Sequence, residues 1–216
     1  MNWMKHAMSG AIVAAVAVAA PAAFADTKTE TFVEKNANAV LQVLNDNSLT
    51  PDQRAKTFAG YMNKFAHMPS IAQRVLGPKA RELTEDQRQR YFKAFEDYAL
   101  AVYQYRLDQF RGEAIKVTAS ENEGPRRYLV TTEIKSADTG QQTRVVWDVL
   151  ESQDGASYRV RDVALDIKGN QIWLAQDQAR DFQTILDRNH GDIDKLIDEI
   201  NRMTTELKSG QKLEGE

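Results

Sequence analysis

The segment QTRVVWDVL, residues 142–150, decides the fold class of this 216-residue chain. Polar and apolar side chains alternate along it, and Val145, Trp147 and Val149 fall on one face. This period of two is typical of a β-strand with one buried side. Turn sequences stand at both ends, Asp138-Thr139-Gly140 before it and Asp154-Gly155 after it. The segment is therefore expected to be the middle strand of an antiparallel sheet.

Two neighbouring segments extend the predicted sheet. Residues 126–135 alternate in the same way, and residues 157–167 form the next expected strand. In the latter, the apolar positions change parity near Arg161-Asp162, which predicts a β-bulge there. A further alternating segment begins at Ile115.

Helical periodicity appears on both sides of these strands. The expected helices span residues 27–45, 51–65, 71–76, 85–110, 172–188 and 192–207. Capping boxes at Thr50–Gln53 and Thr84–Gln87 open two of them, and Gly77-Pro78 ends the shortest. The expected fold class is α+β, with helices packed on one side of a curved, mainly antiparallel sheet. Such an arrangement encloses either a solid core or a cavity.

The N-terminus has the pattern of an export signal. Lys5 precedes an apolar run from Ala11 to Ala20, and Ala23-Phe24-Ala25 has the small residues of a cleavage site. The run is short for a membrane anchor. We therefore expect residues 1–25 to be removed and residues 26–216 to form a single exported domain.

Composition excludes several classes of function. The chain has 28 Lys and Arg against 31 Asp and Glu, and this mild acidity argues against nucleic-acid binding. It has no cysteine, which excludes a thiol nucleophile, a zinc knuckle and an iron–sulfur cluster.

Catalytic and metal motifs are not found. Only His67 and His190 remain after the leader, and no HExxH or GxSxG motif is present. The carboxylate pair Asp162 and Asp166, and the pair Asp177 and Asp181, are typical of solvated faces. We expect no catalytic residue, no metal site and no cofactor.

Several stretches, taken together in order, resemble one family. They are IAQRVLG at 71–77, TEDQR at 84–88, FKAFEDY at 92–98, VRDV at 160–163 and FQTIL at 182–186, with Gly191-Asp192 following. This set is similar to the MlaC family of periplasmic phospholipid-binding proteins, also called the toluene-tolerance family. Departures such as Pro78-Lys79-Ala80, which follow the first stretch, leave the lipid open between a phospholipid and a hopanoid-like lipid.

The resemblance implies a function and a set of partners. It implies a monomeric periplasmic carrier that moves phospholipid between an outer-membrane lipoprotein complex and an inner-membrane ABC transporter with an MCE-domain protein. Such transport maintains the lipid asymmetry of the outer membrane. The implied fold is a cone of helices on a curved sheet, like nuclear transport factor 2.

A lipid carrier must enclose its cargo. About 30 methylenes at ~0.8 kcal/mol each would cost about 25 kcal/mol to hold in water. We expect the tails to lie between one sheet face and the long helix. The predicted lipid-binding residues are Leu76, Phe95, Tyr98, Tyr103, Val130, Val145, Trp147, Val149, Val163, Leu165 and Ile167.

Two other functions are compatible with the same pattern. One is an enzyme of isomerase or dehydratase type, for which Asp162 or His67 would project into the pocket. The other is an envelope chaperone or scaffold with a solid core. Exposed basic positions such as Arg126-Arg127 are candidates for docking a partner.

Overall fold

The structure is a computed structural model that describes residues 27–108, 114–135, 140, 142–167 and 170–210. The predicted signal peptide, residues 1–25, lies outside the described residues, as do Asp138, Thr139 and Gly169 of the predicted turns. The helices are α1 (Thr27–Asn45), α2 (Pro51–Phe65), α3 (Met68–Leu76), the 3-10 helix η1 (Gly77–Arg81), α4 (Glu85–Asp108), α5 (Leu174–Arg188) and α6 (Ile193–Lys208). The strands are β1 (Lys116–Gly124), β2 (Arg127–Lys135), β3 (Gln142–Glu151), β4 (Tyr158–Ile167) and β5 (Asn170–Trp173).

The five described strands form one antiparallel sheet in the order β1-β2-β3-β4-β5. The predicted middle strand, β3, lies between β2 and β4, with Trp147 opposite Val130 on one side and Val163 on the other. Asp148 pairs with Asp162 and Val149 pairs with Val160, so Arg161 is the extra residue of a bulge. The predicted bulge is therefore confirmed.

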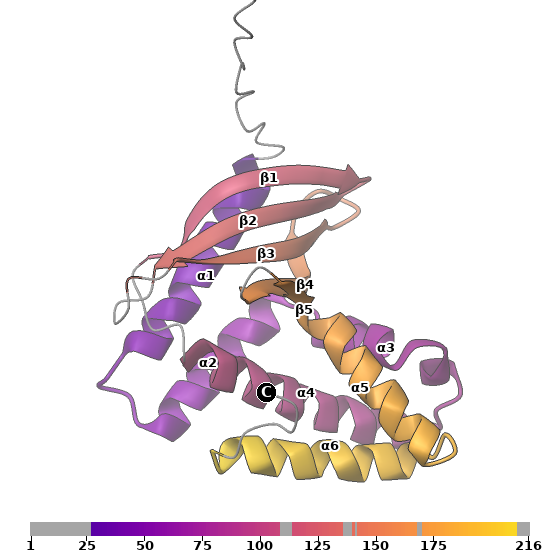
Figure 1. Cartoon of the computed structure of the whole chain (residues 1–216). Coiled ribbons are helices and arrows are strands. Elements are labelled where there is room, and N and C mark those ends of the chain that lie inside the picture. The colour runs from indigo at the N-terminus through magenta and orange to yellow at the C-terminus, as the bar shows by residue number, and fades with distance from the viewer. Residues whose placement is uncertain (1–26, 109–113, 136–139, 141, 168–169, 211–216) are drawn as a thin grey trace, which may run out of the picture.

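The helices gather on one face of this open sheet (Figure 1). Helix α1 packs on α2 and on strands β1 and β2, while α4 packs on α6 and α3 on α5. The predicted α+β class, with helices on one side of an antiparallel sheet, is confirmed. The helices that pack mainly on one another, α3 to α6, are called the far layer below.

Local sequence explains where the helices begin. Helix α2 has the predicted capping box, in which the Gln53 amide donates to the Thr50 hydroxyl at 3.3 Å and the Gln53 side chain accepts from the Thr50 amide at 2.9 Å. Helix α3 begins at Met68 rather than at residue 71, because the His67 ring accepts from the Ser70 amide at 3.2 Å and caps it. Gly77 ends this helix at φ +63°, a conformation that favours glycine.

The far layer has a solid aromatic core, made of Tyr91, Phe95 and Tyr98 of α4 with Phe182 of α5. Phe95 and Phe182 meet edge to face, with ring centroids 6.2 Å apart and planes at 89°. The Tyr91 hydroxyl donates to the Ala72 carbonyl at 2.9 Å, and burial raises the pKa of this phenol. The side chains of this aromatic core are at most 3% exposed.

Candidate functional site

An apolar cavity of about 60 Å³ lies between helix α1, the end of α2, the inner face of the sheet and the start of α5. None of the described lining residues is charged, and the only polar nitrogen or oxygen among their side chains is the indole nitrogen of Trp147. The lining residues are Ala37, Val40, Leu41, Leu44, Met62, Phe65, Ile115, Ile134, Val145, Trp147, Val163, Leu165 and Leu174. The chemistry of this wall suits hydrocarbon.

The sheet contributes to the cavity through cross-strand pairs. Val145 lies directly opposite Leu165, and Trp147 lies opposite Val163. Because side chains alternate along a strand, these four residues share the inner face. The bulge at Arg161 keeps Val160, Val163 and Leu165 on that face in spite of their change of parity.

Trp147 is held in place by a short chain of hydrogen bonds. Its indole nitrogen donates to the Thr132 hydroxyl at 2.9 Å, and that hydroxyl donates to the Val145 carbonyl at 3.3 Å. Thr132 is fully buried on the same inner face. The polar atom of the indole is therefore satisfied within the sheet, and its ring surface is left to line the cavity.

Helix α1 forms the opposite wall. Ala37, Val40, Leu41 and Leu44 recur at helical spacing, so they lie on one face of this helix. Asn38 joins the helix to the sheet, because its side-chain amide donates to the Ile115 carbonyl and its oxygen accepts from the Ile115 amide, both at 2.9 Å. This two-point contact fixes α1 against the beginning of strand β1.

The structure brings four of the predicted lipid-binding residues to the cavity: Val145, Trp147, Val163 and Leu165. Val130 and Val149 lie farther along the same face, where they pack with Val33 of α1 in a separate cluster. Trp147 packs against this cluster.

The other predicted positions lie elsewhere. Leu76, Phe95 and Tyr98 are buried in the far layer of helices and do not line the cavity. The side chains of Tyr103 and Ile167 lie outside the described residues.

The lining residues of α1 and α2, with Ile115, Ile134 and Leu174, were not predicted as site residues. For α1, the apolar face is already clear from the sequence. Periodicity shows that a face is buried, but it does not show which surface lies opposite it.

The two residues that would favour an enzyme have other roles in the structure. His67 caps α3. Asp162 is 4% exposed, and its carboxylate accepts from the Ala175 amide at 2.9 Å and from the Val163 amide at 2.8 Å. It thereby caps α5, which has no side-chain cap at Trp173. Burial raises the pKa of Asp162, and the two amides only partly oppose this.

The molecule is an α+β protein in which helices cover one face of an open antiparallel sheet, with an apolar cavity between the sheet and the helices. Residues 34–202 match the family model described as MlaC protein. The chain therefore belongs to the MlaC family, as its sequence motifs predicted. A comparison with curated proteins gives no match.

Among solved structures, the fold is similar to that of a phospholipid-binding protein from Ralstonia solanacearum, which was determined in complex with a phospholipid. The TM-score is 0.68 at 16% sequence identity, and the match covers 83% of this chain and 98% of the other. The two chains therefore share one fold over nearly their whole described length. Within the described residues, no helix has the length and apolar character needed to cross a membrane.

Proposed function

We propose that this protein is a periplasmic carrier of phospholipid. It takes lipid between an outer-membrane lipoprotein complex and an inner-membrane ABC transporter with an MCE-domain protein, and so maintains outer-membrane lipid asymmetry. The observation that carries the proposal is the apolar wall of the cavity between α1 and the sheet. Membership of the MlaC family and the likeness to a protein solved with a phospholipid support it.

The described cavity is smaller than a two-tailed lipid requires. Its volume of about 60 Å³ is far below the roughly 300–1,000 Å³ of ligand pockets. Lipid tails therefore enter only when α1 and the sheet move apart. Helix α1 packs on α2, β1 and β2, and none of the four rings of the aromatic core comes from it, so we place the opening at this boundary.

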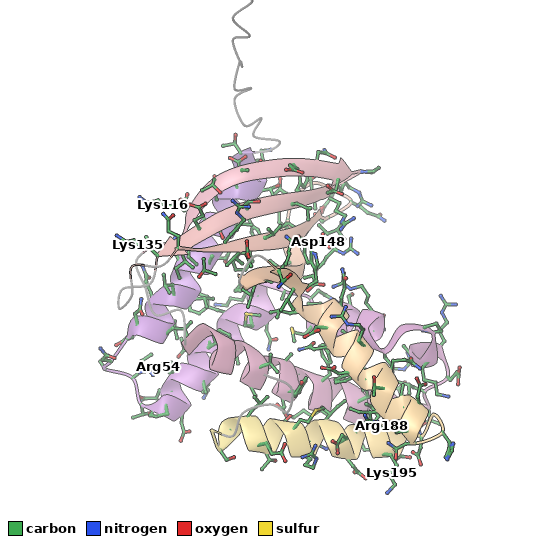
Figure 2. The ribbon with its side chains drawn as sticks, in the orientation of Figure 1. Arg54, Lys116, Lys135, Asp148, Arg188 and Lys195 are labelled. Atoms are coloured by element: carbon green, nitrogen blue, oxygen red, sulfur yellow. The ribbon has the colours of Figure 1, made fainter. Side chains whose placement is uncertain are left out.

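The headgroup stays outside the apolar wall. Lys116 and Lys135 directly follow the lining residues Ile115 and Ile134, and Figure 2 shows both lysines at one end of the sheet. A phosphate placed at this end would meet exposed ammonium groups rather than a fitted polar pocket. We infer that the protein selects lipids by their chains more than by their headgroups, so a hopanoid-like lipid competes if its apolar part fits.

The same geometry favours a binding protein over an enzyme. The lining residues that the structure describes include no titratable side chain, and both His67 and Asp162 are used as helix caps. A general acid or base must reach the reacting atoms to within hydrogen-bond distance. Neither group is placed to do so from the cavity wall.

The test is mass spectrometry of an organic extract from the purified chain, residues 26–216, after export to the periplasm. About one phospholipid per protein is expected, and its species give the chain preference. If the extract is empty, and remains empty after incubation with phosphatidylglycerol and phosphatidylethanolamine vesicles, the carrier function is wrong. An envelope chaperone or scaffold with a solid core would then be the better-supported function.

A further inference from the structure

Arginines flank the most exposed large hydrophobic side chain of the described residues. Leu150 of β3 is 36% exposed, and it pairs with Arg127 of β2 on one side and Arg159 of β4 on the other. Alternation from Val149, which faces inward, places this row on the outer face of the sheet. Leu150 is therefore an apolar spot between two guanidinium groups.

Arg126, beside this row, has a strained backbone. Pro125 and Arg126 form the turn between β1 and β2, and Arg126 has φ +60°. A positive φ at the second turn position favours Gly or Asn, since a larger side chain is strained there. The side chain itself is exposed and forms no ion pair with any carboxylate that the structure describes. An arginine therefore stands where the backbone alone would favour glycine.

The positive charge continues from the sheet to the helices. Arg127 and Arg161 both approach the buried carboxylate of Asp148, at 3.0 and 4.0 Å. The Arg161 carbonyl accepts a hydrogen bond from the guanidinium of Arg74 on α3. Arg74 in turn lines a hollow of about 590 Å³ with Arg81 and Arg88, where Ser70 and Gln73 add polar groups and no lining residue is acidic.

These seven arginines form one basic band, defined as residues 74, 81, 88, 126, 127, 159 and 161. The carboxylates within it are Asp148 and Asp162, both buried, while Glu151 follows Leu150 in sequence, Glu82 follows Arg81, and Glu85 lies 3.7 Å from Arg88. Glu123 lies near Arg127. The band is therefore net positive on a chain whose formal net charge is −3.

We propose that the basic band is the docking surface for an acidic segment of a partner protein, with Leu150 as its apolar contact. This proposal deepens the proposed function, because a carrier must dock before lipid is transferred. Guanidinium groups bind carboxylates through two parallel hydrogen bonds, and arginine is enriched where proteins meet. The band shares no residue with the cavity lining, so docking leaves the lipid site unobstructed.

A protein segment fits the band better than a membrane does. Arg74, Arg81 and Arg88 line a hollow, which a protruding acidic side chain enters and a flat layer of headgroups does not. Leu150 alone offers little apolar area for insertion into lipid.

The test uses a fluorescein-labelled oligoglutamate peptide that contains one leucine, with binding followed by fluorescence anisotropy at low and high salt. The band variant carries Arg81→Ala, Arg126→Gly and Arg159→Ala, because these three arginines form no ion pair with a described carboxylate. The control variant carries Arg90→Ala, Arg180→Ala and Arg202→Ala, which removes the same charge from exposed positions on α4, α5 and α6. At about threefold per exposed arginine, the band variant should bind roughly thirtyfold more weakly and lose most of its salt dependence. The control should stay within about twofold of the parent protein.

Equal weakening in both variants would overturn the proposal, since it would show a response to net charge alone. Binding to phosphatidylglycerol vesicles without binding to the peptide would replace the protein partner with a membrane surface. Arg126→Gly alone gives a second readout: it should raise the melting temperature and weaken peptide binding, whereas a purely structural arginine would not give this combination.

Lipid content of the same samples separates this proposal from the proposed function. The band variant should carry as much lipid as the parent, because its substitutions lie outside the cavity. Absence of lipid from the parent itself would contradict the carrier function, while the peptide result would still decide whether the basic band binds acidic protein.

Discussion

The cavity and the aromatic core are packed in opposite ways. In the aromatic core, Phe95 and Phe182 are at most 1% exposed and meet edge to face. In the cavity, most of the described lining side chains are aliphatic, Trp147 and Phe65 are the aromatic ones, and about 60 Å³ is left unfilled. Interlocking rings fix one arrangement, whereas branched aliphatic side chains can move apart and repack around a guest. The first region supplies stability, and the second is suited to change its volume.

The largest expected effect tests the solid region. Phe95→Ala removes a ring that contacts both Tyr91 and Phe182, so it should lower the free energy of unfolding by about 3–5 kcal/mol. Urea denaturation followed by circular dichroism measures this loss. Phe92→Ala is the control, because Phe92 is only half-buried on the same helix and should cost clearly less. A similar loss in both variants would mean that the aromatic core is not the main source of stability.

The next effect tests the cavity. Val163→Glu places a carboxylate on the apolar wall, which should weaken lipid retention by about 2–3 kcal/mol, or roughly 30- to 150-fold. Lipid per protein, measured by mass spectrometry of the extract, gives the result. Leu150→Glu introduces the same charge on the outer face and should leave the lipid content unchanged. Retention of lipid by a folded Val163→Glu protein would move the tails to another site.

A smaller effect tests the boundary between α1 and the sheet. Asn38→Ala leaves both backbone groups of Ile115 without their side-chain partner, so it should cost about 1–2 kcal/mol of stability. Lipid transfer to acceptor vesicles should become faster, because opening this boundary breaks fewer bonds. Asn36→Ala is the matched control, since Asn36 donates only to the Phe32 carbonyl within the same helix. Equal transfer rates for the two variants would show that opening occurs elsewhere.

The smallest effect concerns the pKa of Asp162, which burial raises above its ordinary value of 3.8. The folded protein therefore binds this proton more tightly than the unfolded chain does, so the charged form carries a penalty at neutral pH. That penalty is relieved as the pH falls through the raised pKa toward 3.8. Asp162→Asn should change stability at pH 7 by less than about 1 kcal/mol, since its side-chain oxygen can still accept from Ala175.

The measurement is the stability difference between the parent protein and Asp162→Asn from pH 7 to pH 4. The parent should gain relative to the variant as the pH falls. A difference that moves in the opposite direction would mean that the helix cap, rather than burial, dominates this carboxylate.

Strand alternation predicted much of the sheet. The inward positions of β3, the hairpin turn after it and the bulge at Arg161 all follow from which residues are apolar and where glycine stands. The first residues of α5 were predicted less well. Residues 172 and 173 were expected to be helical, but Ile172 pairs with Leu165 in strand β5, and α5 begins only at Leu174. Tertiary pairing outweighed the local helical pattern there.

The cavity itself could be predicted only in part. The sheet side was accessible, since Val145, Trp147, Val163 and Leu165 share one face of paired strands. The helical side was not, because Leu76, Phe95, Tyr98 and Tyr103 were expected to line the lipid site. Leu76, Phe95 and Tyr98 instead pack in the far layer of helices. Which buried face meets which neighbour depends on distant contacts that a local pattern does not contain.

The lining of the cavity also has a consequence for the direction of transport under the proposed function. The described lining has no charged group, and its one polar nitrogen, in the Trp147 indole, is already hydrogen-bonded, so it holds different lipids of similar chain length with nearly the same free energy. Such a carrier equilibrates with whichever membrane it meets and performs no work of its own. Net flow then follows the chemical potential of the lipid at the two ends of the route, and only a partner that consumes energy can drive it uphill.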